Sequence, residues 1–135
     1  MLKLILGLNG SGKTKKLIEM VNEAVKTSTG SVVCIEKSDK LRYDVSYQCR
    51  LISTDNYSIF DSQSLYGFIA GIYASNHDIT DIYIDAILDI TGGDIDGFDK
   101  LVDEIGIFAE ANGIHIVITA TIDEAAATDR MKKYI

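Results

Sequence analysis

The sequence predicts a single α/β domain, a three-layer α/β/α sandwich around a mostly parallel sheet of five strands. Short apolar stretches alternate along the chain with longer stretches whose apolar residues recur at helical spacing. Most of the short stretches are apolar almost throughout, as in strands that helices cover on both faces. The 135 residues, 47% of them hydrophobic, are enough for one core without a metal or disulfide. We therefore expect residues 1–135 to form one domain.

The chain opens with a strand, a loop and a helix. Residues 2–6 are mostly apolar and stop at Gly7, which predicts a short buried strand. A glycine-dense segment follows. From Lys13 onward, Leu17 and Val21 begin an apolar stripe at helical spacing, with charged residues on the other faces. This order is the context that a phosphate-binding loop requires.

Residues 7–14 read Gly-Leu-Asn-Gly-Ser-Gly-Lys-Thr and match the pattern G-x-x-x-x-G-K-[ST]. The glycines let the backbone curl so that its N–H groups surround a triphosphate. The Lys13 ammonium can then reach the β- and γ-phosphates, and the Thr14 hydroxyl can ligate Mg²⁺. The expected nucleotide-binding residues of this loop are Gly7, Asn9, Gly10, Ser11, Gly12, Lys13 and Thr14.

Residues 7–14 resemble the Walker A motif of the P-loop nucleoside-triphosphatase superfamily, and the layout of the whole chain is compatible with one such domain. The motif is specific for the superfamily but not for a reaction. It contacts phosphates only, so it does not select a base. Because the guanine-selecting pattern N-K-x-D is absent, ATP with Mg²⁺ is the expected ligand.

A second informative stretch is the short strand that closes at Asp85. The P-loop resemblance implies an acidic group at the end of a neighbouring strand, holding Mg²⁺ beside the Thr14 hydroxyl. We expect Lys13 and Asp85 to be catalytic, and Thr14 and Asp85 to hold the metal. In P-loop ATPases of the additional-strand class a glutamate usually follows this aspartate, but here Ala86 stands there. Rapid unaided hydrolysis is therefore in doubt.

Two more strands and a helix are expected between these stretches. A polar segment, residues 37–48, leaves the carboxyl edge of the sheet, where open α/β sheets bind ligands. Arg42 or Tyr43 either contacts the ligand there or lies in a solvated connection. The expected elements are strands at 31–36 and 50–53 and a helix that Asp61 or Ser62 caps.

The last third of the chain predicts a helix that begins at Asp94 or Asp96 and a buried strand at 114–119. The P-loop resemblance implies that Thr119, at the end of this strand, is a polar sensor of the γ-phosphate. Thr119 therefore joins the expected nucleotide contacts. Residues 131–135 are expected to add a short terminal strand.

Two sheet orders fit these elements. A recombinase-like order inserts the strand at 114–119 between the first strand and the strand that ends at Asp85. A kinase order makes those two strands direct neighbours. We favour the recombinase-like order, which requires the strand at 114–119 to pair with both of them.

Composition restricts the partners. The net charge of −7 and the absence of a basic run interleaved with aromatic residues give no indication of a nucleic-acid surface. There is neither an apolar stretch of membrane-spanning length nor a secretory leader, and Cys34 and Cys49 lack metal or disulfide spacing. We expect a cytoplasmic protein that binds nucleotide and no membrane, with a protein partner or a homo-oligomer still open.

Three functions remain open from the sequence. The first is a small Mg-ATP-dependent ATPase or nucleotide switch. The second is a small-molecule kinase, since the layout loosely resembles the type II thymidine kinase core, although the acid after Asp85 and the cysteine-bearing lasso are missing. The third is a regulatory module that binds nucleotide without turnover and signals to a partner protein.

Overall fold

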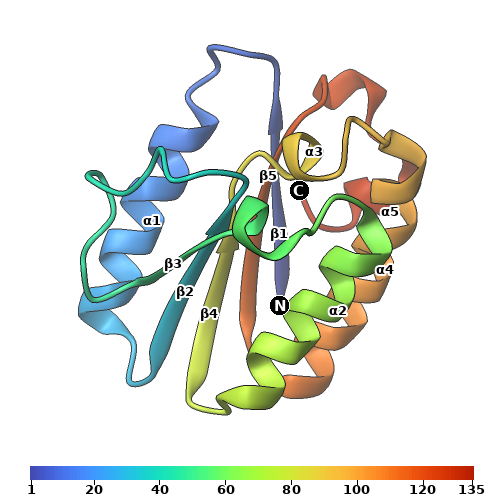
Figure 1. The fold of residues 1–135 in the computed structure, drawn as a ribbon. Coiled ribbons are helices and arrows are strands. Elements are labelled where there is room, and N and C mark those ends of the chain that lie inside the picture. The colour runs from blue at the N-terminus through green and yellow to red at the C-terminus, as the bar shows by residue number, and fades with distance from the viewer.

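A computed structural model describes all residues 1–135 and confirms the α/β architecture. A five-stranded sheet with every strand pair parallel carries helices on both faces (Figure 1). Parallel strands end at the same edge, so the turns that follow them gather there. The spatial order of the strands is β1 (Leu2–Gly7), β5 (His115–Thr121), β4 (Ile79–Ile84), β2 (Ser31–Glu36) and β3 (Arg50–Ser53).

The position of β5 confirms the recombinase-like order and shows that the kinase order is wrong. β5 pairs with β1 on one side and with β4 on the other. In register, Thr119 is opposite Ile5 of β1, and Ile118 is opposite Ile84 of β4. Asp85, the residue after Ile84, is therefore level with Thr119, the residue after Ile118, and β5 continues beyond this point to Thr121.

The main helices divide unequally between the two faces. α1 (Lys13–Thr27) covers one face, and α2 (Ser62–Ser75) and α4 (Ile95–Asn112) lie side by side over the other (Figure 1). Asp61 and Asp94, each the first of the two candidates that the sequence left open, cap α2 and α4. Their carboxylates accept the N–H groups of Ser64 and Gly97 at 2.8 and 3.0 Å. None of the helices is both long enough and apolar enough to cross a membrane.

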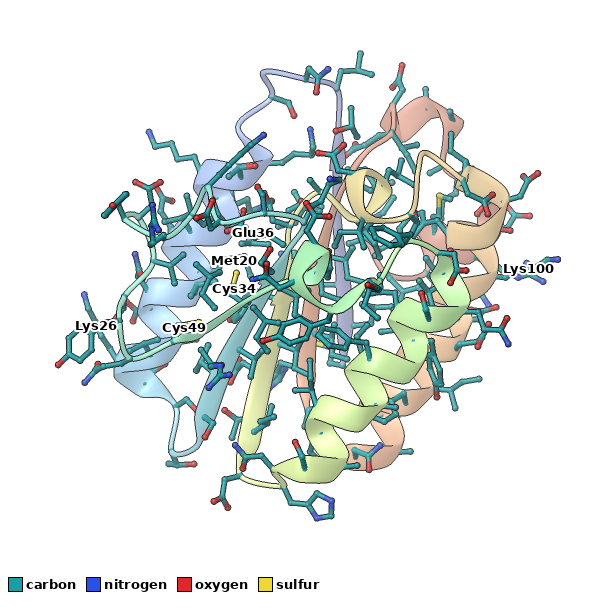
Figure 2. All side chains as sticks on the ribbon, viewed as in Figure 1. Met20, Lys26, Cys34, Glu36, Cys49 and Lys100 are labelled. Atoms are coloured by element: carbon teal, nitrogen blue, oxygen red, sulfur yellow. The ribbon has the colours of Figure 1, made fainter.

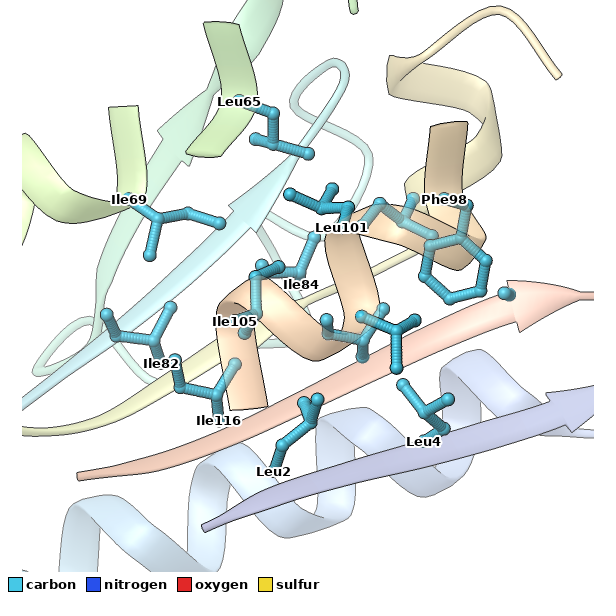
Figure 3. Close-up of a cluster of buried hydrophobic side chains, with 14 of the residues drawn as sticks. Leu2, Leu4, Leu65, Ile69, Ile82, Ile84, Phe98, Leu101, Ile105 and Ile116 are labelled. Atoms are coloured by element: carbon cyan, nitrogen blue, oxygen red, sulfur yellow. The ribbon is translucent and has the colours of Figure 1, made fainter. Parts of the chain in front are cut away.

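Two hydrophobic clusters hold these layers together. The larger contains 24 buried residues and fills the space between the sheet and α2 and α4 (Figure 3). Ile82, Ile84 and Ile116 enter it from the strands, and Leu101 and Ile105 enter from α4. The smaller contains 11 buried residues under α1, including Cys34 and Cys49. Burial of this apolar surface is the main stabilising contribution to the fold.

Four short helical elements complete the chain: the 3-10 helices η1 (Thr54–Tyr57) and η2 (Glu124–Ala126), and the α-helices α3 (Ile87–Ile90) and α5 (Asp129–Lys132). The prediction of a terminal strand at 131–135 is wrong, because α5 occupies the start of that segment. The Thr128 hydroxyl accepts the Met131 N–H at 3.2 Å and caps α5, which buries the Met131 side chain completely. Only the Tyr134 carbonyl reaches β1, where it accepts the Leu4 N–H at 2.8 Å.

Candidate functional site

A cavity of about 470 Å³ opens at the carboxyl edge of the sheet, and we call it the sheet-edge cavity. Its walls come from the loop between β1 and α1, the segment after β2, and the turn after β4. Although the chain carries a net charge of −7, the cavity is lined by four lysines and three acidic residues. The charged residues of its walls are Lys13, Lys15, Lys37, Lys40, Glu36, Asp85 and Asp89.

The loop before α1 presents main-chain donors to this cavity. Gly10 and Gly12 adopt left-handed backbone conformations with φ of 81° and 85°, which glycine tolerates best. The N–H groups of Gly12, Lys13, Thr14 and Lys15 donate no hydrogen bond within the protein, and all four residues line the cavity. Because these groups lie at the positive end of α1, they form an arrangement suited to an anion.

The Lys13 side chain folds back over the same loop. Its Nζ donates to the Leu8 carbonyl at 3.0 Å and lies 3.5 Å from the Ser11 Oγ. The ammonium therefore stands beside the free main-chain amides, within the reach of a phosphate bound to them.

Thr14 and Asp85 line the cavity side by side, and Thr119 contacts Asp85 from behind. The Thr14 hydroxyl lies 3.2 and 3.1 Å from the two carboxylate oxygens of Asp85, and the Thr119 hydroxyl lies 2.7 Å from Asp85 Oδ1. Asp85 is 7% exposed and follows β4 directly. Its buried carboxylate is thus held by hydroxyl donors from two other elements, as a buried charge requires.

The structure brings together most of the residues that the sequence predicts for the site. The ones that line the cavity are Asn9, Gly10, Gly12, Lys13, Thr14 and Asp85. Gly7 ends β1 and Ser11 lies in the loop, and neither lines the cavity; Thr119 lies behind Asp85 rather than on the wall. In this structure the Thr119 hydroxyl donates to Asp85 Oδ1, and its predicted contact with phosphate stays a prediction.

Segment 37–48 does border the cavity, but through residues other than those singled out from the sequence. Lys37, Ser38, Lys40 and Leu41 line it, whereas Arg42 and Tyr43 do not. The Arg42 guanidinium lies 4.8 Å from the centre of the Tyr43 ring and pairs with Asp39. The first residues of the segment therefore border the cavity, whereas Arg42 and Tyr43 lie in a solvated connection.

Glu36 is a site residue that sequence reasoning missed. It ends β2, is 5% exposed and lines the cavity next to Asp85, whose N–H donates to the Ile35 carbonyl at 2.9 Å. Figure 2 shows Glu36 near the end of β2, with Cys34 and Cys49 further down. An acid that closes an apolar strand was the signal used for Asp85, and the same signal was present at Glu36.

The surroundings of the Glu36 carboxyl group affect its acidity. Burial raises its pKa above the usual value of 4.5, and the neighbouring charges of Asp85 and Asp39 act in the same direction. Main-chain hydrogen bonds oppose this: the N–H groups of Lys40 and Leu41 donate to its two oxygens at 3.1 and 3.0 Å. Glu36 therefore combines an anchoring contact to segment 37–48 with a proton affinity above that of an ordinary glutamate.

The donor set of the cavity fits magnesium that arrives with phosphates. The chain has no group of three or more histidine, cysteine, aspartate or glutamate side chains that could hold a metal ion. Thr14 and Asp85 supply two adjacent oxygen donors. Since Mg²⁺ prefers oxygen ligands and usually takes one or two from a protein, with phosphates and water supplying the others, two are sufficient.

Comparison with known proteins gives no family to which the chain can be assigned: no protein-family model matches it, and no curated protein matches it.

Proposed function

We propose that this chain is a Mg-ATP-binding P-loop protein that acts as a small ATPase or nucleotide switch. The observation that carries the proposal is the row of four unpaired main-chain amides at the start of α1, with the Lys13 ammonium beside them and the Thr14–Asp85 pair below. The order of the sheet, with β5 between β1 and β4, is compatible with this superfamily.

Each group has a separate part in binding. The amides of residues 12–15 would hold phosphate oxygens through hydrogen bonds and the dipole of α1. Lys13 would add a charge-assisted bond to the β- and γ-phosphates. Thr14 and Asp85 would hold Mg²⁺, which when bound neutralises charge on the phosphates. ATP is proposed as the nucleotide because nothing in the chain matches the guanine-selecting pattern.

The position of Glu36 is an argument that the protein hydrolyses the nucleotide in addition to binding it. A general base must lie on the cavity wall, and a raised pKa brings a carboxylate closer to the range in which it accepts a proton effectively. Glu36 meets both conditions. In the proposed reaction a water oxygen attacks the γ-phosphorus, the bond from the γ-phosphorus to the bridging oxygen breaks, and Glu36 takes a proton from the water. The products are ADP and phosphate.

One observation favours a second candidate, the regulatory module that binds nucleotide and signals to a protein partner. Segment 37–48 lines the cavity at Lys40 and Leu41, yet it exposes Tyr43 and Tyr47 by 87% and 93%. Tyrosine and arginine are enriched at the energetic centres of protein interfaces. A nucleotide that contacts the first part of this segment would therefore lie next to a surface suited to a protein partner.

Calorimetric titration of the protein with Mg-ATP tests the proposal, with Lys13→Ala as the test variant. Loss of a charge-assisted bond to phosphate should weaken binding by about 10- to 100-fold. Lys100→Ala is the matched control, because Lys100 is exposed on α4 and does not line the cavity; Figure 2 shows it on the opposite side of the molecule from Glu36. Equal heats of binding for wild type and Lys13→Ala would overturn the proposal. Phosphate release measured on the same samples separates the ATPase from the non-hydrolysing module.

A further inference from the structure

We propose that Thr119 is a positioning residue that acts through Asp85, fixing the Asp85 carboxylate in the orientation that the magnesium site needs. The inference rests on the proposed function and deepens it, because it states how the metal-binding half of the cavity is set before any ligand arrives. It also replaces the role that the sequence suggested for Thr119, a direct contact with the γ-phosphate.

Thr119 is buried, and its hydroxyl links Asp85 to the main chain of Ala86. It is 1% exposed near the end of β5, and its hydroxyl takes part in two short hydrogen bonds. Thr119 Oγ1 donates to Asp85 Oδ1 at 2.7 Å, and the Ala86 N–H donates to Thr119 Oγ1 at 2.7 Å. Two consecutive residues after β4 are therefore tied to one side chain of the neighbouring strand.

The number of protons on a hydroxyl group decides what Thr119 can do. A threonine hydroxyl has one proton to donate and two lone pairs to accept with. Ala86 supplies a proton to one lone pair, and Asp85, an acceptor when ionised, takes the single proton of Thr119. No proton is left for a phosphate oxygen. Thr119 therefore influences a bound nucleotide through Asp85 and not by direct contact.

The bond to Thr119 restricts rotation of the Asp85 carboxylate. Asp85 Oδ1 lies 2.7 Å from the Thr119 hydroxyl, and the Thr14 hydroxyl lies at nearly equal distances from Oδ1 and Oδ2, 3.2 and 3.1 Å. With Oδ1 held from β5, the carboxylate keeps both oxygens toward Thr14 at the start of α1. Groups behind metal ligands commonly fix ligand orientation in this way.

The backbone of Ala86 supports the same interpretation. Ala86 has a φ of 50°, one of two non-glycine residues in the chain with a positive φ. Such a conformation is uncommon for a residue with a side chain and persists where its surroundings hold it. Here it turns the chain from β4 into α3 while the Ala86 N–H bonds to Thr119. Thr119 thus holds both the carboxylate and the turn that carries it.

The experiment compares Thr119→Val, which keeps the shape and removes the hydroxyl, with Thr119→Ser, which keeps the hydroxyl. ATP binding is measured by calorimetry at increasing Mg²⁺ concentration and also without Mg²⁺. We expect Thr119→Val to need about 10- to 100-fold more Mg²⁺ for half-maximal enhancement of binding, the effect typical of losing a group behind a metal ligand. Thr119→Ser should match wild type, and the Mg²⁺-free affinity should be unchanged in both.

Thr91→Val is the control for loss of a buried hydroxyl as such. Thr91 is 5% exposed and does not line the cavity, and its hydroxyl donates only to the Ile87 carbonyl, so its Mg²⁺ requirement should equal that of wild type. Hydrogen exchange of the Ala86 amide gives a readout without metal or nucleotide. Exchange should be slow in wild type and in Thr119→Ser, and faster in Thr119→Val.

The outcomes separate this inference from the proposed function. Wild-type protein that binds ATP, together with a Thr119→Val variant of unchanged Mg²⁺ requirement, overturns the role of Thr119 alone. Wild-type protein that does not bind ATP at all overturns the proposed function and the role together. If Thr119→Val does not fold, weak Mg²⁺ dependence in folded Thr119→Ser or fast exchange of Ala86 in wild type overturns the inference.

Discussion

The two faces of the sheet are made from alternate residues of the same strands, yet their chemistry differs at the carboxyl edge. On the face under α2 and α4, β4 contributes Ile82 and Ile84 to the larger apolar cluster. On the face under α1, the same strand contributes Tyr83, and Asp85 follows at its end. The other two strands also change from an apolar to a polar residue on the α1 face: β5 from Val117 to Thr119, and β2 from Cys34 to Glu36.

This difference shows how one small sheet can carry both a core and a site. Because side chains alternate between faces, a polar residue at a strand end changes one face and leaves its apolar neighbours on the other intact. The buried polar groups at this edge do not destabilise the fold strongly, because each is hydrogen-bonded: Asp85 to two threonines, and Glu36 to two main-chain amides. Stability should therefore depend mostly on one face and ligand binding mostly on the other.

The largest expected effect on stability is in the larger apolar cluster, on the face under α2 and α4. Ile105→Ala removes a fully buried side chain from the middle of α4 and should lower the free energy of unfolding by about 2–5 kcal/mol. The affinity of the folded protein for Mg-ATP should not change. Urea unfolding and calorimetry measure the two quantities. Ile107→Ala is the control, because Ile107 is 70% exposed on the same helix and its loss should change stability by less than about 0.5 kcal/mol.

The next effect concerns the polar residues at the carboxyl edge of the face under α1, and it leaves both apolar clusters intact. Glu36→Gln removes the proposed base and should slow ATP hydrolysis by about 100-fold or more, while Mg-ATP affinity stays within about twofold. Phosphate release under saturating ATP measures the first quantity. Glu104→Gln, an exposed change on α4, serves as the control. A Glu36→Gln protein that hydrolyses ATP at the wild-type rate would exclude Glu36 as the base.

The smallest expected effect is the pH dependence that Glu36 gives to stability. Burial raises its pKa in the folded protein above 4.5, so the folded state keeps this proton to higher pH than the unfolded chain does. Wild-type protein therefore loses free energy of unfolding as pH rises from about 4.5 through the folded pKa. Glu36→Gln lacks this loss, so its stability relative to wild type should increase with pH across that window.

Urea unfolding of both proteins at a series of pH values measures this slope. The comparison uses the slope rather than the offset, because glutamine offers one acceptor oxygen where the carboxylate offers two to Lys40 and Leu41. Parallel stability curves for the two proteins would show that the Glu36 carboxyl group has the same proton affinity in the folded and unfolded states. Glu36 would then contribute nothing to the pH dependence of stability.

Much of the fold follows from patterns within short stretches of the chain. Short apolar stretches predicted the strands, and Asp61 and Asp94 were each one of two candidate caps, because capping is decided within one turn of helix. Residues 131–135 were mispredicted as a strand, since the apolar Met131 satisfies a strand pattern as well as a helix pattern. The Thr128 cap and the packing of Met131 in the larger cluster stabilise the helix instead of a strand.

By itself, the sequence determined the loop before α1 and the acid at the end of β4, because both are defined by residues close together in the chain. Only the tertiary structure decided that Glu36 borders the cavity and that Thr119 stands behind Asp85. Residues 36 and 119 lie in β2 and β5, and residue 85 directly follows β4, so they come together when these three strands pair. Their chemistry depends on distances across the sheet, and spacing along the chain does not fix those distances.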